Sequence, residues 1–463
     1  MSSEINLINV ESSTYVNIPE PLGILQLAAN LEKNNFKVKV LDMSVDKRSV
    51  KNFFDSDLIG LSFSTPNVLK TKEIIKEIRS YNPNAKIMIG GSHASALPEM
   101  ALKEIEADIV ARKESDLTIV EIAEGKLLKD ILGISYKENN KIHHNPDRPF
   151  IENLDILPYP ARHLVDMDKY DIHFTWEGLK PAATVFSSRG CFANCIYCAS
   201  KITWERIVRF RSAEHVLGEI QELKEKYGRK EILFYDDVFP LKQERLVKIC
   251  EGLKDMNMSW CCLSRVDTLR EDNAKLMAES GCHMVNFGVE SGSSKILQNL
   301  DKGLGENPIE VKNKIRKAFD LCHKHKISTK ASFMFGSPEE TKESIQETID
   351  MIYEIMPDYM WIFSLTPIVG TELWNMHKEK GILQDNWSLY DQNLYNKYIN
   401  TSLSYDFVRK KIRNTYLNYY LSPKYFLRQI KRGSLKPYKA MFEEFSGAIR
   451  YVLSGKTRKI EAE

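Results

Sequence analysis

Residues 187–198 read SSRGCFANCIYC, a run that gathers Cys191, Cys195 and Cys198 into one short loop. The spacing C-x3-C-x2-C brings together enough thiolates to hold three irons of a [4Fe-4S] cluster and leave the fourth iron without a protein ligand. An iron without a protein ligand is a place where a substrate can bind. Two other hypotheses are a thioredoxin-type pair at Cys195 and Cys198, and a zinc site completed by a distant His or Cys.

The run resembles the signature of radical S-adenosylmethionine (SAM) enzymes, including the aromatic residue, Tyr197, before the last cysteine. In that family SAM chelates the open iron, and one electron from the cluster cleaves it to a 5′-deoxyadenosyl radical. The resemblance therefore implies a [4Fe-4S] cluster on Cys191, Cys195 and Cys198, SAM as cofactor, and an external electron donor such as flavodoxin or ferredoxin.

Composition narrows the classes of protein. The 463 residues carry a net charge of +2 with acids and bases interspersed, so no basic footprint for nucleic acid is visible. Neither a signal peptide nor a run of about 18 apolar residues appears, which predicts a cytoplasmic protein without a membrane span. Five further cysteines are expected to be small buried thiols rather than a second cluster: Cys250, Cys261, Cys262, Cys282 and Cys322.

Strand-like and helical patterns alternate in the first 145 residues, which predicts a doubly wound, Rossmann-like parallel sheet with helices on both faces. The expected strands are Ile5–Val10, Val38–Leu41, Leu58–Phe63, Lys86–Ile89 and Ala107–Ala111. The expected helices are Leu22–Lys33, Val68–Tyr81 and Pro98–Glu106.

Small and polar residues follow the third and fourth strands, in Ser62-Phe63-Ser64-Thr65 and Gly90-Gly91-Ser92-His93. Ligands of such sheets bind beyond the carboxyl ends of the strands, where glycines allow close approach of a bulky group. Gly-Gly after a strand is also an ordinary turn. Together with Pro21-Leu22-Gly23, these segments resemble the cobalamin-binding domain of cobalamin-dependent radical SAM enzymes. The implied cobalamin contacts are Leu22, Gly23, Ser62, Ser64, Thr65, Gly90, Gly91, Ser92, His93 and Glu114.

Two features depart from that pattern. The D-x-H-x-x-G element that places a histidine beneath cobalt in other cobalamin proteins is absent, because Asp171-Ile172-His173 lies outside this domain and lacks the glycine. We therefore expect cobalt without a histidine below it; His93 is the alternative ligand, although contact with the corrin periphery is the favoured interpretation. The second departure is Lys113, which stands before Glu114 where relatives usually carry glycine.

From about Thr184, strand and helix alternate six times, which matches the partial (β/α)6 TIM-like barrel of radical SAM enzymes. The expected strands lie near Thr184–Ser187, Glu231–Tyr235, Trp260–Ser264, His283–Val289, Thr329–Phe335 and Met360–Leu365. Each is followed by a polar or glycine-containing segment, as expected where barrel chemistry gathers at the C-terminal strand ends. Polar loops at strand ends have an ordinary explanation too, but that explanation does not account for the cysteines.

The resemblance also implies roles for residues at those ends. Glu290 and Ser291 match contacts to the ribose and amino-acid parts of SAM, Gly336 and Pro338 shape the backbone near adenine, and Tyr197 offers its backbone to adenine while its ring packs. Arg265 either binds the SAM carboxylate or pairs with Asp267 as a structural bridge.

Asp236 and Asp237 follow the second barrel strand and are the candidate catalytic residues. Paired acids are typical of acid/base chemistry. Capping of the next helix by one of them is an equally good interpretation.

The predicted organisation is a cobalamin-binding domain (1–145), a linker (146–180), the barrel (181–385) and a C-terminal helical region (386–463). The linker is expected to turn the barrel mouth toward the carboxyl edge of the first sheet. The tail is rich in aromatic and basic residues, including Tyr416, Tyr419, Tyr420 and Tyr425, and its helical spacing predicts packing against the barrel.

Two cofactors together imply C-methylation of an unactivated carbon: a deoxyadenosyl radical abstracts hydrogen, and methylcobalamin delivers the methyl group. The substrate is either a small molecule or a protein side chain. The alternative is a cobalamin-dependent radical SAM cyclase or rearrangement enzyme without net methyl transfer. A third hypothesis, from a different class, is a protein that senses redox state or cobalamin.

Overall fold

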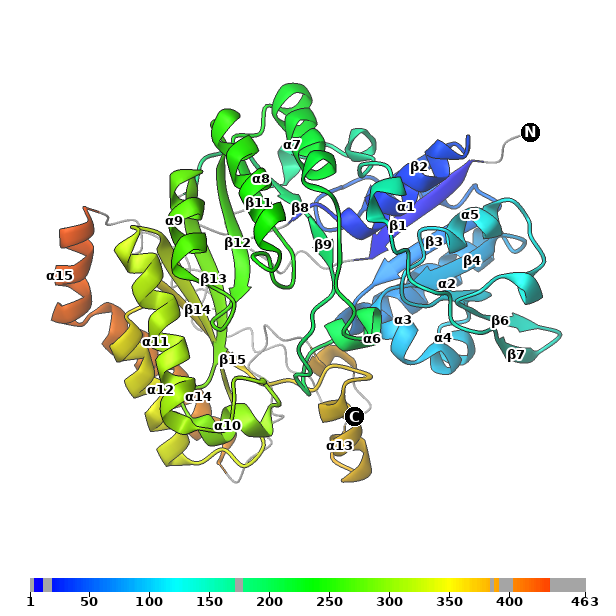
Figure 1. The fold of residues 1–463 in the computed structure, drawn as a ribbon. Coiled ribbons are helices and arrows are strands. Elements are labelled where there is room, and N and C mark those ends of the chain that lie inside the picture. The colour runs from blue at the N-terminus through cyan, green and yellow to red at the C-terminus, as the bar shows by residue number, and fades with distance from the viewer. Residues whose placement is uncertain (1–3, 11–18, 171–177, 384–386, 391–402, 434–463) are drawn as a thin grey trace.

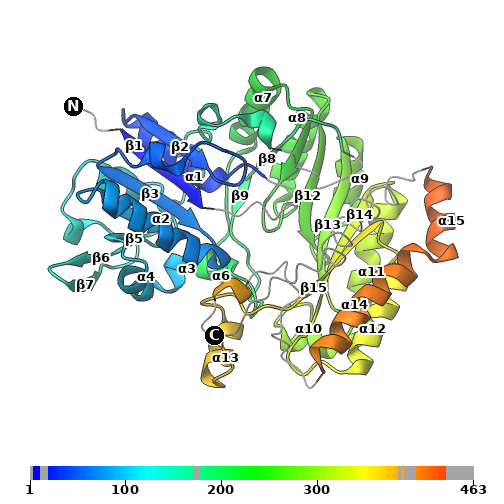
Figure 2. The same ribbon diagram turned by 180° about the vertical axis from the view of Figure 1, so that it is seen from behind.

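The computed structural model describes residues 4–10, 19–170, 178–383, 387–390 and 403–433. Two large sheets lie side by side, and the segment around β9 and α6 runs between them (Figures 1 and 2). No helix in these ranges is long and apolar enough to cross a membrane.

The N-terminal sheet has the strand order β2-β1-β3-β4-β5-β6-β7. Its strands are β1 (Ile5–Val10), β2 (Val38–Asp42), β3 (Leu58–Phe63), β4 (Lys86–Gly90), β5 (Ile109–Ala111), β6 (Ile134–Glu138) and β7 (Lys141–His144). The first five run parallel, as predicted. Strand order reverses at β1, and a crevice for ligands forms beyond the carboxyl ends of strands at such a switch point.

Helices cover both faces of this sheet, which confirms the doubly wound fold. Helices α1 (Leu22–Lys33) and α5 (Thr118–Ala123) pack on one face, and α2 (Val68–Tyr81) and α4 (Pro98–Glu104) pack on the other. The short helix α3 (Ser92–Ala96) follows β4 directly. Because both faces are covered, the central strands are buried along almost their whole length instead of alternating between buried and exposed residues.

The sequence prediction missed the antiparallel hairpin of β6 and β7 at the edge of this sheet. Its outer strand is partly exposed and polar, so it lacks the apolar run that marks the central strands. The turn between them is formed by Asn139 and Asn140, whose φ angles of 50° and 61° are left-handed. Such residues at both central positions are typical of a two-residue hairpin turn.

The second sheet contains six parallel strands in the order β15-β14-β13-β12-β11-β8, which confirms the partial barrel. The strands are β8 (Ala182–Val185), β11 (Glu231–Phe234), β12 (Ser259–Arg265), β13 (Cys282–Glu290), β14 (Ser328–Phe335) and β15 (Tyr359–Ser364). The outer helices are α7 (Ala213–Tyr227), α8 (Gln243–Asp255), α9 (Glu271–Glu279), α11 (Pro308–Lys324) and α12 (Lys342–Ile355).

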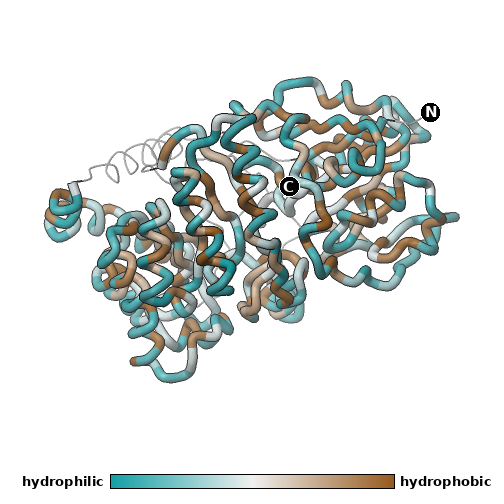
Figure 3. Tube along the Cα trace, turned by 45° about the horizontal axis from the view of Figure 1, so that its top comes forward, coloured by the Kyte–Doolittle hydropathy of each residue, from teal (hydrophilic) through white to brown (hydrophobic). Residues whose placement is uncertain are grey.

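The main hydrophobic core lies between the barrel strands and these helices. Figure 3 shows hydrophobic stretches inside and hydrophilic ones outside along the same helices. Since all six strands are parallel, their carboxyl ends meet at one edge, and the smaller elements gather near it. These are β9 (Ser188–Arg189), β10 (Arg209–Phe210), α6 (Ser200–Trp204), α10 (Ser294–Asn299) and α13 (Glu372–Glu379).

The C-terminal helices α14 (Tyr405–Tyr420) and α15 (Pro423–Arg432) cover the edge strand β15. The hydroxyls of Tyr420 and Tyr416 accept hydrogen bonds from the backbone N–H groups of Met360 (3.0 Å) and Ile362 (2.8 Å). A helix that satisfies an open strand edge in this way prevents pairing with other chains. The tail therefore packs on the barrel, as predicted, while residues 386, 391–402 and 434–463 of that region lie outside the described residues.

The connection between the sheets contacts both of them. Ala161 N–H donates to Leu25 O (3.0 Å) and the Tyr170 hydroxyl to Asp42 (3.0 Å), both in the N-terminal sheet region. Arg162 donates to Thr184 O of β8 (2.8 Å). These bonds fix how the two sheets face each other. Asp171 and His173 lie outside the described residues.

Candidate active site

The three cysteines of the C-x3-C-x2-C run lie in one loop between β9 and α6, and all three are free thiols. Backbone N–H groups point at two of the sulfurs: Ala193 N lies 3.5 Å from Cys191 Sγ, and Ser200 N lies 3.5 Å from Cys198 Sγ. Such N–H···S bonds are among the interactions that tune the potential of iron–sulfur clusters. The donor set fits a cluster held by three thiolates.

Contacts with distant elements hold the loop in place. Ile196 N donates to Leu300 O (3.1 Å), and Ile196 O accepts from Leu373 N of α13 (2.9 Å). Gly190, directly before Cys191, has φ of +97°, and a Cβ there would lie 2.0 Å from Ile207 O. Glycine is therefore required where the chain turns into the loop.

Burial shapes the chemistry of the thiols. Burial raises the pKa of Cys198 to about 12 and also raises the pKa of Cys191. The thiolates that bind iron therefore form when the metal displaces their protons. Arg265 and Lys302 lie close enough to the cysteine loop for their positive charges to offset the negative charge of the thiolates.

Glu290, a predicted SAM contact, lies opposite a buried base that the sequence analysis missed. Lys302 Nζ is 2.9 Å from Glu290 Oε1 and 3.4 Å from the Tyr197 hydroxyl. Burial alone would lower the pKa of Lys302. The negative charges of Glu290 and Cys195 have the larger effect together, so the pKa of the lysine is raised. Glu290 itself has φ of +69° beside a register shift in β13, which turns its side chain away from the regular pleat.

Arg265 makes the expected pair with Asp267, and its contact with the SAM carboxylate stays a prediction. Its guanidinium makes two hydrogen bonds of 2.9 Å with the Asp267 carboxylate and donates to Lys302 O at 2.8 Å. Ser291 is fully buried, and its hydroxyl is hydrogen-bonded to Thr348 (2.9 Å). Both side chains therefore brace the strand ends on which a SAM site would be built.

Gly336 and Pro338 form the turn after β14. Gly336 has φ of +92°, and its N–H donates to the buried carboxylate of Glu340, which also accepts from Ser337 N (3.3 Å). Burial raises the pKa of Glu340 to about 7. The shape of this turn thus depends on a buried acid that the sequence analysis did not single out.

The two candidate acids after β11 have different environments. Asp236 is fully buried and accepts hydrogen bonds from the Ser187 backbone N–H (2.6 Å) and from the hydroxyls of Ser187 and Ser188. It holds the chain that leads into the cysteine loop. Asp237 accepts from the Ser200 hydroxyl (2.8 Å) and opens onto a cavity, although burial within the molecule raises its pKa.

That cavity measures about 430 Å³ and lies between the two sheets. From the N-terminal sheet region it is lined by the predicted cobalamin contacts Leu22, Gly23, Ser62, Gly90, Gly91 and Glu114. From the barrel it is lined by Phe186, Ser188, Arg189, Gly190, Tyr235 and Asp237. A Cβ added at Gly23 would meet no atom within 4 Å, so the wall there leaves room for a bulky group.

The remaining predicted cobalamin contacts, Ser64, Thr65, Ser92 and His93, are not among the residues that line the cavity. The Nδ1 of His93 pairs with the Thr65 hydroxyl (3.0 Å), and its ring packs edge-on against Trp387 with centroids 5.1 Å apart. Burial lowers the pKa of His93 to about 4. His93 is thus placed in an aromatic contact, not in the cavity wall.

Glu114 joins the two sheets instead of facing the cavity freely. Its carboxylate pairs with Arg189 and with Arg209 (2.8 Å) from the barrel side. Lys113 beside it has φ of +57°, the conformation that glycine adopts most easily. Its ammonium pairs with Asp147 (2.7 Å) and with Glu205. The departure from glycine therefore supplies a further bridge between the two halves.

Comparison with known proteins identifies both halves. Residues 10–123 match the B12 binding domain, and residues 185–352 match the radical SAM superfamily. The chain is 34% identical over 427 residues to an uncharacterised methyltransferase of Pyrococcus horikoshii, covering 89% of this chain and 90% of that protein. This chain belongs to the cobalamin-dependent radical SAM methyltransferase family.

Other proteins to which the chain is similar differ in the reaction they are named for. The chain is 27% identical to the cytidylyl-2-hydroxyethylphosphonate methyltransferase of Streptomyces wedmorensis, with 80% of each chain covered. It is 26% identical to an anaerobic magnesium-protoporphyrin IX monomethyl ester cyclase of Rubrivivax gelatinosus, covering 77% of this chain and 63% of that protein.

The fold matches a solved family member as well. The radical SAM methyltransferase TsrM from Kitasatospora setae, solved with cobalamin and a [4Fe-4S] cluster bound, aligns with a TM-score of 0.66 and 18% identity, over 82% of this chain and 75% of that one. The cofactors of this cobalamin-dependent radical SAM enzyme are therefore a [4Fe-4S] cluster, SAM and cobalamin.

Several residues that build the site carry no local sequence signal. Lys302 lies in Leu300-Asp301-Lys302-Gly303, which looks like an ordinary polar turn, and Glu340 looks like a surface acid before α12. Both are buried because distant elements close over them. The sequence singles out Glu290 and Gly336, but it does not reveal that Lys302 and Glu340 pair with them.

Proposed function

We propose that this enzyme transfers a methyl group to an unactivated carbon of its substrate, with SAM as both radical source and methyl source. One observation carries this proposal: a single cavity is walled by predicted cobalamin contacts on one side and by the flank of the cysteine loop on the other. A substrate held there would meet both cofactors at once.

When bound, the cluster and SAM supply hydrogen abstraction, and cobalamin supplies the methyl group. The chain itself has three tasks. Cys191, Cys195 and Cys198 hold iron, Glu290 and Lys302 offer an acceptor and a donor to the polar parts of SAM, and the glycine walls admit a flat, bulky group against the N-terminal sheet. Reducing equivalents come from an external protein donor.

Asp237 is the side chain best suited to hold the substrate. It opens onto the cavity beside the cysteine loop, whereas Asp236 is committed to Ser187 and Ser188. A carboxylate in this position accepts a hydrogen bond from a substrate hydroxyl or amine and orients the carbon that reacts. The substrate, a small molecule or a protein side chain, is proposed to carry such a donor.

The test is a search for methylated product under anaerobic conditions. Purified holoenzyme, a chemical reductant and SAM with a trideuteromethyl group are incubated with metabolite and protein fractions of cell extract. The proposal expects a new product carrying the label, together with 5′-deoxyadenosine and S-adenosylhomocysteine. A product that is formed with 5′-deoxyadenosine but without label would favour the cyclase or rearrangement alternative.

Replacement of Asp237 by Asn tests its assigned role. We expect iron and cobalt contents within error of wild type, because Asp237 holds neither cofactor, and a fall in labelled product of roughly 10- to 100-fold. Formation of 5′-deoxyadenosine should fall much less, because radical formation then becomes uncoupled from transfer. Asp236→Asn is the comparison, and it should lower stability and iron content instead. Equal loss of both products in Asp237→Asn would contradict the assignment.

A further inference from the structure

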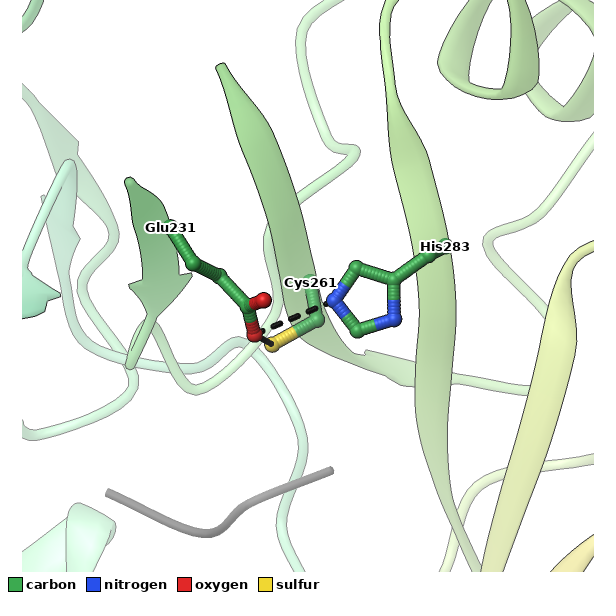
Figure 4. Close-up of side chains that lie close together, drawn as sticks. All are labelled: Glu231, Cys261 and His283. Carbon is green, nitrogen blue, oxygen red and sulfur yellow. Dashed lines mark hydrogen bonds and ion pairs between the residues drawn. The ribbon is translucent and has the colours of Figure 1, made fainter. Parts of the chain in front are cut away.

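A second cluster of metal-binding side chains lies at the opposite end of the barrel from the cysteine loop. Glu231, Cys261 and His283 stand near the N-terminal ends of the neighbouring strands β11, β12 and β13, and their side chains converge (Figure 4). His283 Nε2 is 3.1 Å from Glu231 Oε1, and Cys261 Sγ is 3.9 Å from the same oxygen. One ligand atom from each residue lies within 4.8 Å of the others.

A β-bulge places His283 in this cluster. Trp260 pairs with Cys282 and Cys261 pairs with Met284, so His283 is the extra residue of β13. Cys282 faces the helices and Met284 faces the barrel interior. Bulges of this kind re-aim a side chain, and they are frequent at barrel rims.

The imidazole of His283 has unused bonding capacity. Both ring nitrogens are shielded from solvent, and neither makes a hydrogen bond with any residue that the structure describes, even though the Glu231 carboxylate is adjacent. Leaving a shielded polar atom without a partner is costly, and a metal ion would remove that cost for the nitrogen it binds. Glu231 and Cys261 are themselves buried.

We propose that Glu231, Cys261 and His283 bind a zinc ion as a structural site, with a water molecule as the fourth ligand. Sulfur, imidazole nitrogen and carboxylate oxygen are the donors of zinc sites, at about 2.0–2.3 Å from the ion. Tetrahedral geometry at that radius sets ligand atoms about 3.3–3.8 Å apart, and the distances of 3.1 and 3.9 Å are near this range. Binding displaces the thiol proton of Cys261 to solvent, and the thiolate and carboxylate then balance the charge of the ion.

Neighbouring residues orient the ligands of this site and set the charge around it. Glu231 also accepts hydrogen bonds from Leu179 N–H and from Ser259 Oγ (3.4 Å), which orient its carboxylate. The positive charge of the Lys330 ammonium favours the thiolate form of Cys261, and the ammonium lies 2.9 Å from the centre of the Trp361 ring. A dication beside this lysine requires two anionic ligands, and Glu231 and Cys261 provide them.

The position of the site indicates a role in stability. It ties three adjacent strands together at the end of the barrel away from the chemistry, the end where conserved features of such barrels serve stability. Because its ligands share no residue with the cysteine loop, its occupancy is independent of iron. The inference is likewise independent of the proposed methyl transfer.

Metal analysis of the full-length holoenzyme tests the inference. After dialysis against zinc and a desalting step, we expect one equivalent of zinc beside the iron and cobalt. His283→Ala and Cys261→Ala should each lower bound zinc by roughly tenfold or more, with iron and cobalt unchanged. Cys322→Ala, which removes another buried free thiol outside the cluster, is the matched control and should keep its zinc.

A cobalt(II) titration keeps the test decisive if a variant fails to fold. In full-length protein with Cys191, Cys195 and Cys198 all replaced by Ala, bound Co2+ should give the d–d bands of a tetrahedral site and a thiolate charge-transfer band, and zinc should displace it. Absence of zinc from the wild-type holoenzyme, or zinc retained undiminished by His283→Ala, would overturn the proposal. A spectrum without the thiolate band would do so as well.

Discussion

Gly190 turns the chain into the cysteine loop at a point where a side chain has no room. We predict that Gly190→Ala loses most of its cluster, because the added Cβ would collide with Ile207 O and the positive φ disfavours alanine. Iron and sulfide analysis after reconstitution is the measurement. Gly228→Ala is the control: its φ of +62° is also positive, although closer to the left-handed helical region that alanine can adopt, and no described atom lies within 4 Å of its Cβ position. Full iron in Gly190→Ala would refute the prediction.

Glu340 should make stability depend on pH. Its folded pKa of about 7 exceeds the ordinary 4.5, so between these pH values the folded protein keeps a proton that the unfolded chain has lost. The free energy of unfolding therefore falls as pH rises across this window, by up to roughly 3 kcal/mol. Glu340→Gln mimics the protonated acid and should flatten this fall.

Thermal unfolding of apoprotein at several pH values between 5 and 8 would measure the effect of Glu340. Glu339→Gln, which changes the exposed neighbouring acid, is the control and should keep the wild-type dependence of stability on pH. Parallel profiles for wild type and Glu340→Gln would show that another group causes the pH dependence.

Several predicted site residues make contacts within the protein that their local sequence does not reveal. The polar character of Ser291 and Arg265 was correctly associated with strand ends, but their bonds to Thr348 and Asp267 direct them into the protein. The contact of Glu114 with cobalamin stays a prediction, and the structure adds that Arg189 of β9 and Arg209 of β10 hold its carboxylate. Thr348 and the two arginines lie far from their partners in sequence, so no local pattern reveals those contacts, whereas Asp267, two residues from Arg265, was one of its two expected partners.

At the scale of elements, tyrosines of α14 accept the hydrogen bonds that β15 would otherwise donate to a neighbouring strand. We predict that Tyr416→Phe and Tyr420→Phe each lower the free energy of unfolding by about 1–3 kcal/mol, because each leaves a backbone N–H of β15 without its acceptor. Chemical denaturation would measure this. Tyr81→Phe, on an exposed ring, should be neutral. If neither Tyr416→Phe nor Tyr420→Phe lowers the free energy of unfolding more than Tyr81→Phe does, these tyrosines do not stabilise the edge of β15.

Most elements could be predicted because the central strands are continuous apolar runs, as in Leu58–Phe63, and the helices have amphipathic spacing. The hairpin β6–β7 could not, since an edge strand needs little apolar surface. The turn residues Asn139 and Asn140 indicate a hairpin only once both are known to have left-handed φ angles. The tyrosine-to-strand bonds depend on tertiary placement, which helical spacing does not encode.

At the scale of the whole molecule, buried charges clamp the two sheets together around the cavity. Glu114 and Asp116 meet Arg189 and Arg209 across the interface. We predict that Arg209→Met destabilises the protein by about 1–3 kcal/mol, because Glu114 loses one charged hydrogen-bond donor and keeps only Arg189 as a countercharge, and that it weakens cobalamin retention. Arg316→Met removes an exposed pair with Glu354 and should cost less than about 1 kcal/mol.

Denaturant unfolding and cobalt analysis after desalting would measure both effects of the clamp. If Arg209→Met is no less stable than Arg316→Met, the clamp contributes nothing. If stability falls while cobalt is retained, the clamp fixes the fold without shaping the cavity.

The same clamp determines how this chain can be divided. Each sheet has its own hydrophobic core, so cutting the connection and expressing two halves is an obvious strategy. Each half would then expose half of a charge network: Glu114 and Asp116 on one piece, and Arg189 and Arg209 on the other. The pieces should reassociate readily at low ionic strength and poorly at high ionic strength, since exposed charges are screened by salt. The affinity between two separately expressed halves of this enzyme would thus be set by the salt concentration.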